Sequence, residues 1–256
     1  MALIFLSPFY IIIVNSFKTK AQLFTSTLAF PKSLIVDNFK DAYAELDFFN
    51  SLFHSLIITI ISVVVIIIFS SMAAWVLERT RSKISNIILM IFVAAMIIPF
   101  QAVMLPLIRL MGKLHFLNVP GLIFMYLGFG VSQAIFLYHG FLKSIPVELD
   151  EAAMLDGCSK LQAFWYIIFP LLKPMSVTVS VLDVVWIWND YLLPSLVINK
   201  PNTMTIPLKT FFFFGEYTKQ WNLALAGLIL DIIPVVIFYF FAQKHIIKSV
   251  TAGSIK

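Results

Sequence analysis

The chain has 256 residues, of which 61% are hydrophobic and only 12% are charged. Soluble domains carry roughly twice that charged fraction, so the composition excludes an ordinary soluble domain and indicates a polytopic membrane protein. The formal net charge is +5, but Lys and Arg are scattered between apolar stretches, which argues against a nucleic-acid-binding surface. The single cysteine, Cys158, excludes an internal disulfide.

Long apolar runs predict an all-α fold with six transmembrane helices in one domain, residues 1–256. A helix needs about twenty apolar residues to cross roughly 30 Å of hydrocarbon. The first run is short but lacks a basic leader and a small-residue cleavage site, so we expect a retained span rather than a signal peptide. The predicted spans are residues 2–17, 51–77, 84–110, 120–142, 175–198 and 221–242.

The loops between these spans carry Lys and Arg almost evenly on both sides of the membrane. The clearest bias is the cluster of Arg79, Arg81 and Lys83 in the shortest loop. Because cytoplasmic loops are enriched in Lys and Arg, this cluster favours a cytoplasmic position for that loop. With nearly equal counts on the two sides, however, charge alone does not decide the orientation of the chain.

Residues 144–174 form a polar insert between the fourth and fifth spans, and its pattern predicts a helical hairpin. Pro146 suits the first turn of a helix, where a missing N–H has no cost. Carboxylates near the start of a helix interact favourably with the helix dipole. The residues of this kind are Glu148, Asp150 and Glu151.

The second half of the insert has signals for a turn and another short helix. Gly157 can adopt the left-handed conformation that ends a helix. Ser159 and Gln162 have the spacing of a capping box, which opens the next helix. We expect Pro170 and Pro174 to stop that helix.

Polar residues in the last two spans are candidates for the transport pathway. An ionised carboxylate at mid-bilayer costs on the order of 3 kcal/mol, so such residues usually face a cavity or a partner. Asp183, Trp186 and Asp190 have the spacing of one helix face, with Asn189 beside them. Indole rings stack on sugars and carboxylates accept hydrogen bonds from hydroxyls, but the same groups could instead bond between helices. Asp183 and Asp231 could alternatively carry protons in a secondary transporter.

No sequence pattern predicts a catalytic site. The chain has no phosphate-binding loop of the G-x-x-x-x-G-K-[ST] type, and its nine glycines do not cluster. Its four histidines are isolated from one another and from Cys158, without the spacing of metal ligands. We therefore expect no catalytic residue, no metal site and no cofactor in this chain.

Three segments resemble the permease subunits of bacterial ABC importers. The sequence Glu151-Ala152-Ala153, with Gly157 four residues later and Pro170 further on, is similar to the EAA loop of that family. Trp188-Asn189-Asp190 resembles a second family motif, and residues 243–256 resemble the family's C-terminal ending. The fuller form, EAAMLDG followed by FPLLKP, is similar to the carbohydrate-uptake class, relatives of the smaller maltose-transporter permease.

This resemblance implies that the hairpin lies in the cytoplasm, where it couples the membrane domain to a separate ATPase subunit. In the family, the hairpin sits in a cleft of the ATPase and moves with it. The implied coupling residues are Glu148, Glu151, Ala152, Ala153, Asp156, Gly157 and Pro170. The small alanines would permit close approach, and the aromatic residues Phe164 to Tyr166 would supply buried contact area. Cys158 and Phe169 depart from the family pattern, but both are apolar.

The resemblance also implies a set of partners in and around the bacterial cytoplasmic membrane. They are a second homologous permease, a dimer of ATPase subunits that holds ATP and Mg²⁺, an extracellular sugar-binding protein and the sugar. The outer segment 199–220, with four consecutive phenylalanines, would either contact that binding protein or lie at the membrane surface. A permease for a non-sugar solute remains the alternative within the family.

Overall fold

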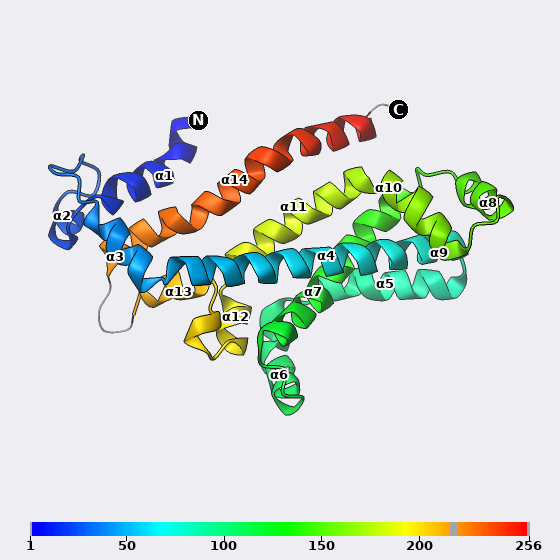
Figure 1. The fold of residues 1–256 in the computed structure, drawn as a ribbon, viewed down its shortest axis with the longest axis horizontal. Coiled ribbons are helices and arrows are strands. Elements are labelled where there is room, and N and C mark those ends of the chain that lie inside the picture. Colours follow the sequence, from blue (N-terminus) through cyan, green and yellow to red (C-terminus); the bar gives the residue numbers. More distant parts are fainter. Residues whose placement is uncertain (1, 216–219, 255–256) are drawn as a thin grey trace. The chain divides into compact units, whose positions relative to one another are not determined.

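A computed structural model describes residues 2–215 and 220–254, with side chains at 4–215, 220–241 and 243. Within these ranges the regular structure is helical and contains no strand (Figure 1). The helices are α1 Ala2–Ser16, α2 Lys20–Thr25, α3 Asp37–Glu45, α4 Phe48–Thr80, α5 Lys83–Ile97, α6 Phe100–Lys113, α7 Val119–Leu142, α8 Glu148–Leu155, α9 Lys160–Ala163, the π-helix η1 Phe164–Ile168, α10 Phe169–Leu171, α11 Lys173–Asn189, α12 Leu192–Val197, the 3₁₀ helix η2 Pro201–Thr203, α13 Ile206–Phe212 and α14 Trp221–Ser254.

The all-α membrane architecture predicted from the sequence is confirmed. Within the described residues, α4, α7 and the part of α14 from Trp221 to Phe241 are long and apolar enough to cross a bilayer. Two bent helix pairs qualify if each pair counts as one span, and α1 is a shorter apolar helix. The number of six spans remains a prediction.

The predicted span 84–110 is not one straight helix. Helix α5 ends at Ile97, α6 begins at Phe100, and the two are bent by 103°. The cause is Pro99, because a proline excludes the residue before it from the helical conformation. Ile98 accordingly has extended backbone, with ψ of 115°.

The predicted span 175–198 is also interrupted. Helix α11 ends at Asn189, and α12 begins at Leu192. The carboxylate of Asp190 accepts hydrogen bonds from the backbone N–H groups of Leu192 and Leu193, at 2.9 and 3.4 Å. An Asp in this position satisfies N–H groups that a helix start leaves without partners, so it favours a new helix over continuation of the old one.

The chain forms two compact units. The first comprises Met1–Ile57 and Trp188–Phe238, and the second comprises Ile58–Ile187 and Tyr239–Lys256. A core of the first unit joins α3 and the outer segment to α14. Its buried members are Ala42, Leu46, Phe213, Leu223, Ala224 and Ala226. Phe211 and Phe212 are exposed, so the four-phenylalanine run is split between core and surface.

The second unit contains the crossing of α4, α7 and α11. Gly130 of α7 lies where a Cβ atom would be 2.5 Å from Ile66 of α4 and 3.6 Å from the indole of Trp186 in α11. Nearby, the hydroxyl of Tyr138 donates to Ser176 at 2.8 Å and ties α7 to α11. This unit also carries the hairpin predicted from the sequence.

Candidate functional site

The local structure of the hairpin follows the signals in the sequence. Helix α8 has three carboxylates in its first turn, as expected for the positive end of a helix dipole. Gly157 has a φ of +87°, in the left-handed region. The side chain of Ser159 accepts from the N–H of Gln162, whose side chain accepts from the N–H of Ser159, so the predicted capping box is confirmed.

The second helical stretch of the hairpin ends at Leu171, between Pro170 and Pro174, as predicted. The chain continues from α9 through η1 and α10 and then bends by 74° into α11. Pro170 lies at the start of α10, and Pro174 lies in the first turn of α11. Pro174 is tolerated there because the N–H groups of a first turn need no partner within the helix. The two prolines therefore flank the bend at which the chain turns from the hairpin into α11.

Helix α8 has one exposed face and one buried face. The exposed face has the i, i+3, i+4, i+7 spacing of a single helical stripe and consists of Glu148, Glu151, Ala152 and Leu155. The opposite face consists of Asp150 and Ala153, and both are buried. Ala153 is thus part of the chain's own interior, which corrects the prediction that it contacts a partner. Asp156, Gly157 and Pro170 are exposed.

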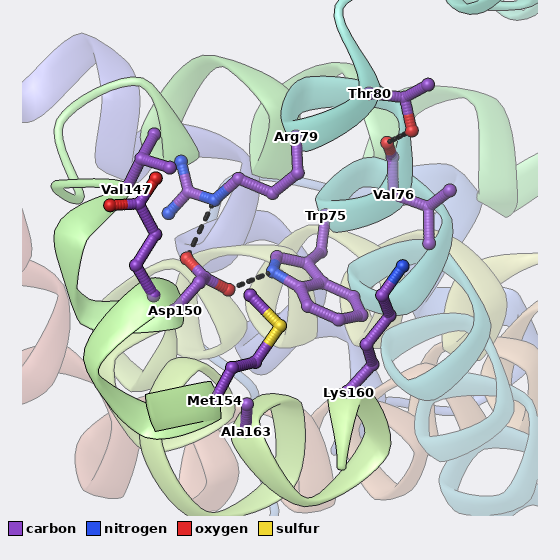
Figure 2. Close-up of a pocket in the computed structure, with 10 residues that line it drawn as sticks. Trp75, Val76, Arg79, Thr80, Val147, Asp150, Met154, Lys160 and Ala163 are labelled. Carbon is purple, nitrogen blue, oxygen red and sulfur yellow. Dashed lines mark hydrogen bonds and ion pairs between the residues drawn. The ribbon is translucent and has the colours of Figure 1, made fainter. Parts of the chain in front are cut away.

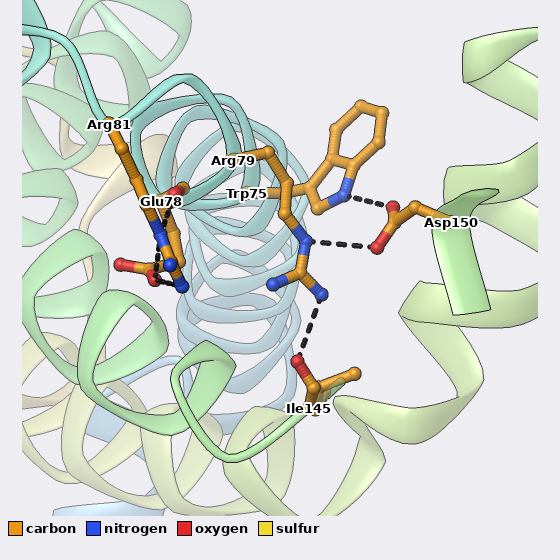
Figure 3. Close-up of polar contacts among 6 residues, drawn as sticks. All are labelled: Trp75, Glu78, Arg79, Arg81, Ile145 and Asp150. Atoms are coloured by element: carbon orange, nitrogen blue, oxygen red, sulfur yellow. Dashed lines mark hydrogen bonds and ion pairs between the residues drawn. The ribbon is translucent and has the colours of Figure 1, made fainter. Parts of the chain in front are cut away.

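Asp150 attaches the buried face of α8 to the end of α4 (Figure 3). One carboxylate oxygen accepts from Nε of Arg79 at 2.9 Å, and the other accepts from the indole N–H of Trp75 at 2.8 Å. Arg79 also donates to the carbonyl of Ile145 at 3.1 Å, just before the hairpin. We call Trp75, Arg79 and Asp150 the clamp. Both charged groups are largely buried, so the pair is shielded from water and strengthened by its hydrogen bonds.

A cavity of about 430 Å³ lies between α4 and the hairpin, next to the clamp. Figure 2 shows that Met154 and Lys160 point toward the same hollow as Trp75. The cavity is bounded by Trp75, Val76, Arg79 and Thr80 of α4, and by Val147, Asp150, Glu151, Met154, Lys160 and Ala163 of the hairpin. Its walls combine apolar surface with charges of both signs, which suits contact with a protein partner.

The tip of the hairpin exposes large apolar side chains. Leu155 is 89% exposed at the end of α8, and Leu161 and Tyr166 are exposed on the second half of the hairpin. Phe164 is fully buried and packs against the ring of Trp75 at 5.3 Å, so it does not supply partner contact as predicted. Leu155 was not identified from the sequence. Its signal is that it is the one large apolar residue in the exposed stripe of α8.

The residues predicted for the transport pathway do not share one helix face. Asp183 is 3% exposed, whereas Trp186 is 40% exposed and contacts Tyr126 edge to face at 5.5 Å. Asn189 is the last residue of α11, and Asp190 lies beyond it and caps α12. The i, i+3, i+7 pattern fails because the helix ends before its last member.

Trp188 and Asp231 form a polar contact between α11 and α14 in the first unit. The indole N–H of Trp188 lies 3.2 Å from a carboxylate oxygen of Asp231 and 3.3 Å from its backbone carbonyl. Both residues are buried. The tryptophan of the Trp188-Asn189-Asp190 motif thus has a structural role within this chain.

The profile of the family described as binding-protein-dependent transport system inner membrane component matches residues 67–252. The chain belongs to this family. It is therefore a permease component of a transport system and a multi-pass protein of the cytoplasmic membrane. The matched range contains the clamp and the whole hairpin. Among the side chains that the structure describes, no group of three or more His, Cys, Asp or Glu residues could hold a metal ion.

Curated relatives match along nearly the whole chain. The probable starch degradation products transport system permease protein of Thermoanaerobacterium thermosulfurigenes is 57% identical over 100% of this chain and 93% of its own length. The multiple sugar-binding transport system permease protein of Streptococcus mutans is 36% identical over 99% of this chain and 93% of its own length. The melibiose/raffinose/stachyose import permease protein of Bacillus subtilis is 34% identical over 97% of this chain and 91% of its own length.

A solved structure has the same fold. It is a bacterial ABC transporter involved in the import of the acidic polysaccharide alginate, with a TM-score of 0.79 and 23% sequence identity. The match covers 95% of this chain and 91% of the other.

Proposed function

We propose that this permease forms half of the membrane pathway of an ATP-driven importer. A second, homologous permease would form the other half. A dimer of ATPase subunits, which holds ATP and Mg²⁺, would dock on the hairpin from the cytoplasm. An extracellular sugar-binding protein would deliver the solute from the other side. The family membership supports this arrangement, because its members work in binding-protein-dependent transport.

The observation that carries the proposal is the combination of an exposed apolar tip with a buried clamp. Leu155 presents apolar surface that water does not favour, as a docking site for another protein does. Asp150, one and a half turns earlier on α8, is bonded to Trp75 and Arg79 of α4. A movement imposed on the tip is therefore passed through α8 to a long helix of the membrane domain.

The cycle requires that each partner prefers one state of the permease over another. ATP favours closure of the ATPase dimer, and the hairpin transmits that motion to the spans. The loaded binding protein must bind the outward-facing state more tightly than the resting state, because a partner with equal affinity for both states shifts no equilibrium. Hydrolysis of ATP then resets the cycle.

We propose that the solute is an oligosaccharide of the kind released from starch. Support comes from the 57% identical relative, whose name states starch degradation products. Two further relatives are named for transport of sugars, including melibiose, raffinose and stachyose. Within the pathway, the half-exposed indole of Trp186 is the best placed of the predicted residues to stack on a sugar ring.

Docking can be tested with Leu155→Glu in the full chain, co-expressed with its ATPase. The new charge at a site that must lose water should reduce the amount of ATPase that co-purifies by at least about tenfold. The matched control is Leu34→Glu, at a 70% exposed leucine of the first unit, which should retain the ATPase. Equal retention of the ATPase by Leu155→Glu and Leu34→Glu would contradict docking at this tip.

The energy source and the solute can be tested with the assembled transporter in vesicles. We expect uptake of malto-oligosaccharides that requires both ATP and the binding protein, with weaker uptake of raffinose. Uptake driven by a proton gradient without ATP would instead support the secondary transporter in which Asp183 and Asp231 carry protons. ATP-driven uptake of a non-sugar solute, with no response to sugars, would leave the importer intact but refute the proposed substrate.

A further inference from the structure

A second cavity of about 490 Å³ lies at the ends of three membrane helices, on the side of α4 opposite the clamp. It is bounded by Leu77, Glu78, Arg81, Asn86, His139 and Lys143. These residues come from the end of α4, the start of α5 and the end of α7. Helices α4 and α7 are long and apolar enough to cross a bilayer, and the cavity lies at their ends, so we expect it near the lipid headgroups.

The one acidic residue of this cavity, Glu78, is buried and already paired. Its carboxylate accepts from Arg81 at 2.7 Å and lies 3.1 Å from Nε2 of His139 (Figure 3 shows the Arg81 contact). Arg81 has a φ of 45°, and this left-handed turn brings its guanidinium back over the last turn of α4. Its side chain is still 64% exposed. With the exposed Lys143 added, the cavity has an excess of positive charge.

An apolar groove of about 360 Å³ continues from this cavity along α5. Asn86 bounds both hollows, and the other groove residues are Ile87, Met90, Ile91 and Ala94. They follow one face of the helix. From Asn86 to Ala94 the groove runs for about 12 Å, at the helical rise of roughly 1.5 Å per residue.

We propose that the cavity and the groove together bind one anionic phospholipid. The phosphate would lie against Lys143 and Arg81, and an acyl chain would lie along α5 from Ile87 to Ala94. A free phosphate would use only the cationic end, and an apolar helix of another subunit would use only the groove. A phospholipid with a negatively charged headgroup matches both, and basic pockets at span ends are known to suit such lipids. This proposal does not depend on the solute or on the ATPase.

Native mass spectrometry of the purified full chain with phosphatidylglycerol or phosphatidylcholine tests the cationic end. The chain should retain phosphatidylglycerol in preference, and Lys143→Gln should weaken that binding about fivefold, the effect of one cation near an anionic lipid. The control is Lys113→Gln, at an exposed lysine at the end of α6, which should bind as the unchanged chain does. Lys143 is preferred to Arg81 because loss of Arg81 would leave buried Glu78 poorly paired.

The groove is tested separately with Ala94→Trp, which fills it, and with Ile88→Trp, at an exposed position outside it. Only the first should weaken phosphatidylglycerol binding, while both variants should elute like the unchanged chain in size exclusion. Equal binding of the two lipids, competition by inorganic phosphate as strong as by the lipid, or unchanged lipid binding in both Lys143→Gln and Ala94→Trp would overturn the proposal.

Discussion

At the scale of single residues, Asp150 connects the hairpin to α4, whereas the neighbouring carboxylates Glu148 and Glu151 are exposed. The first turn of α8 contains three carboxylates, but only Asp150 points inward to Arg79 and Trp75. A buried ion pair is costly to break from one side, because the remaining charge is left without a partner in a poorly hydrated site. Asp150 therefore stabilises the attachment of α8 to α4, and in the mechanism we propose it also transmits the movement of the hairpin to α4.

We expect Asp150→Asn to destabilise the hairpin by about 3 kcal/mol, because it leaves Arg79 buried without a carboxylate. Thermal unfolding of the purified chain should shift to lower temperature. In the assembled transporter, ATP hydrolysis should continue while solute uptake falls, since the ATPase would still hold Leu155 but no longer move α4.

The control for this variant is Asp41→Asn, at an exposed carboxylate of α3, outside the hairpin. It should leave both thermal stability and the ratio of uptake to hydrolysis unchanged. If Asp150→Asn lowers stability but keeps that ratio, the clamp has only a structural role.

The sequence predicts that negative charge gathers at the start of α8, but it does not predict which carboxylate faces inward. That choice depends on how α8 is rotated about its axis. The rotation is set by packing against α4, whose residues Trp75 and Arg79 are distant in the sequence. For the same reason the sequence predicts Ala153 and Phe164 at a partner interface, whereas both are buried within this chain.

At the scale of elements, the hairpin depends on a single left-handed residue between its two halves. Gly157 has a φ of +87°, and no atom lies within 4 Å of the place where a Cβ would stand. A side chain at this position would therefore meet backbone strain but no steric neighbour.

We expect Gly157→Ala to destabilise the protein by about 1 kcal/mol, from the strain of alanine in the left-handed region. The matched control is Gly140→Ala in α7, where an added Cβ also meets nothing within 4 Å but the backbone is helical. That change should stabilise by about 1 kcal/mol, because alanine favours a helix over glycine. Opposite shifts of the melting temperature would confirm this account, and equal shifts would refute it.

Local signals predicted turns and caps well, as Gly157 and the Ser159 capping box show. The effect of a proline depends in addition on its place within a helix. Proline breaks a helix interior but suits a first turn, so Pro99 separates α5 from α6 while Pro174 lies within the start of α11. Pro99 marks the place of the break in the apolar run 84–110, but the sequence does not predict that the bend there is as large as 103°.

At the scale of the whole molecule, composition and spaced motifs were sufficient for the fold class and the family. Both rest on properties summed over the entire chain, namely apolar runs of membrane length and a motif followed by matching segments. The pathway residues were predicted less well. The spacing of Asp183, Trp186 and Asp190 predicts one helical face, but Asp190 lies beyond the end of α11 and Asp183 is buried. Periodicity assumes that a helix continues, and only the structure shows where it ends.

The exposed Leu155 at the tip of the hairpin affects the subunit before it is assembled with its partners. The exposed side chain of Leu155 can associate with any other apolar surface that it meets in water. Copies of the chain that lack their partner subunits would aggregate or be degraded by proteases. Co-expression with the other subunits should therefore improve the yield of folded protein.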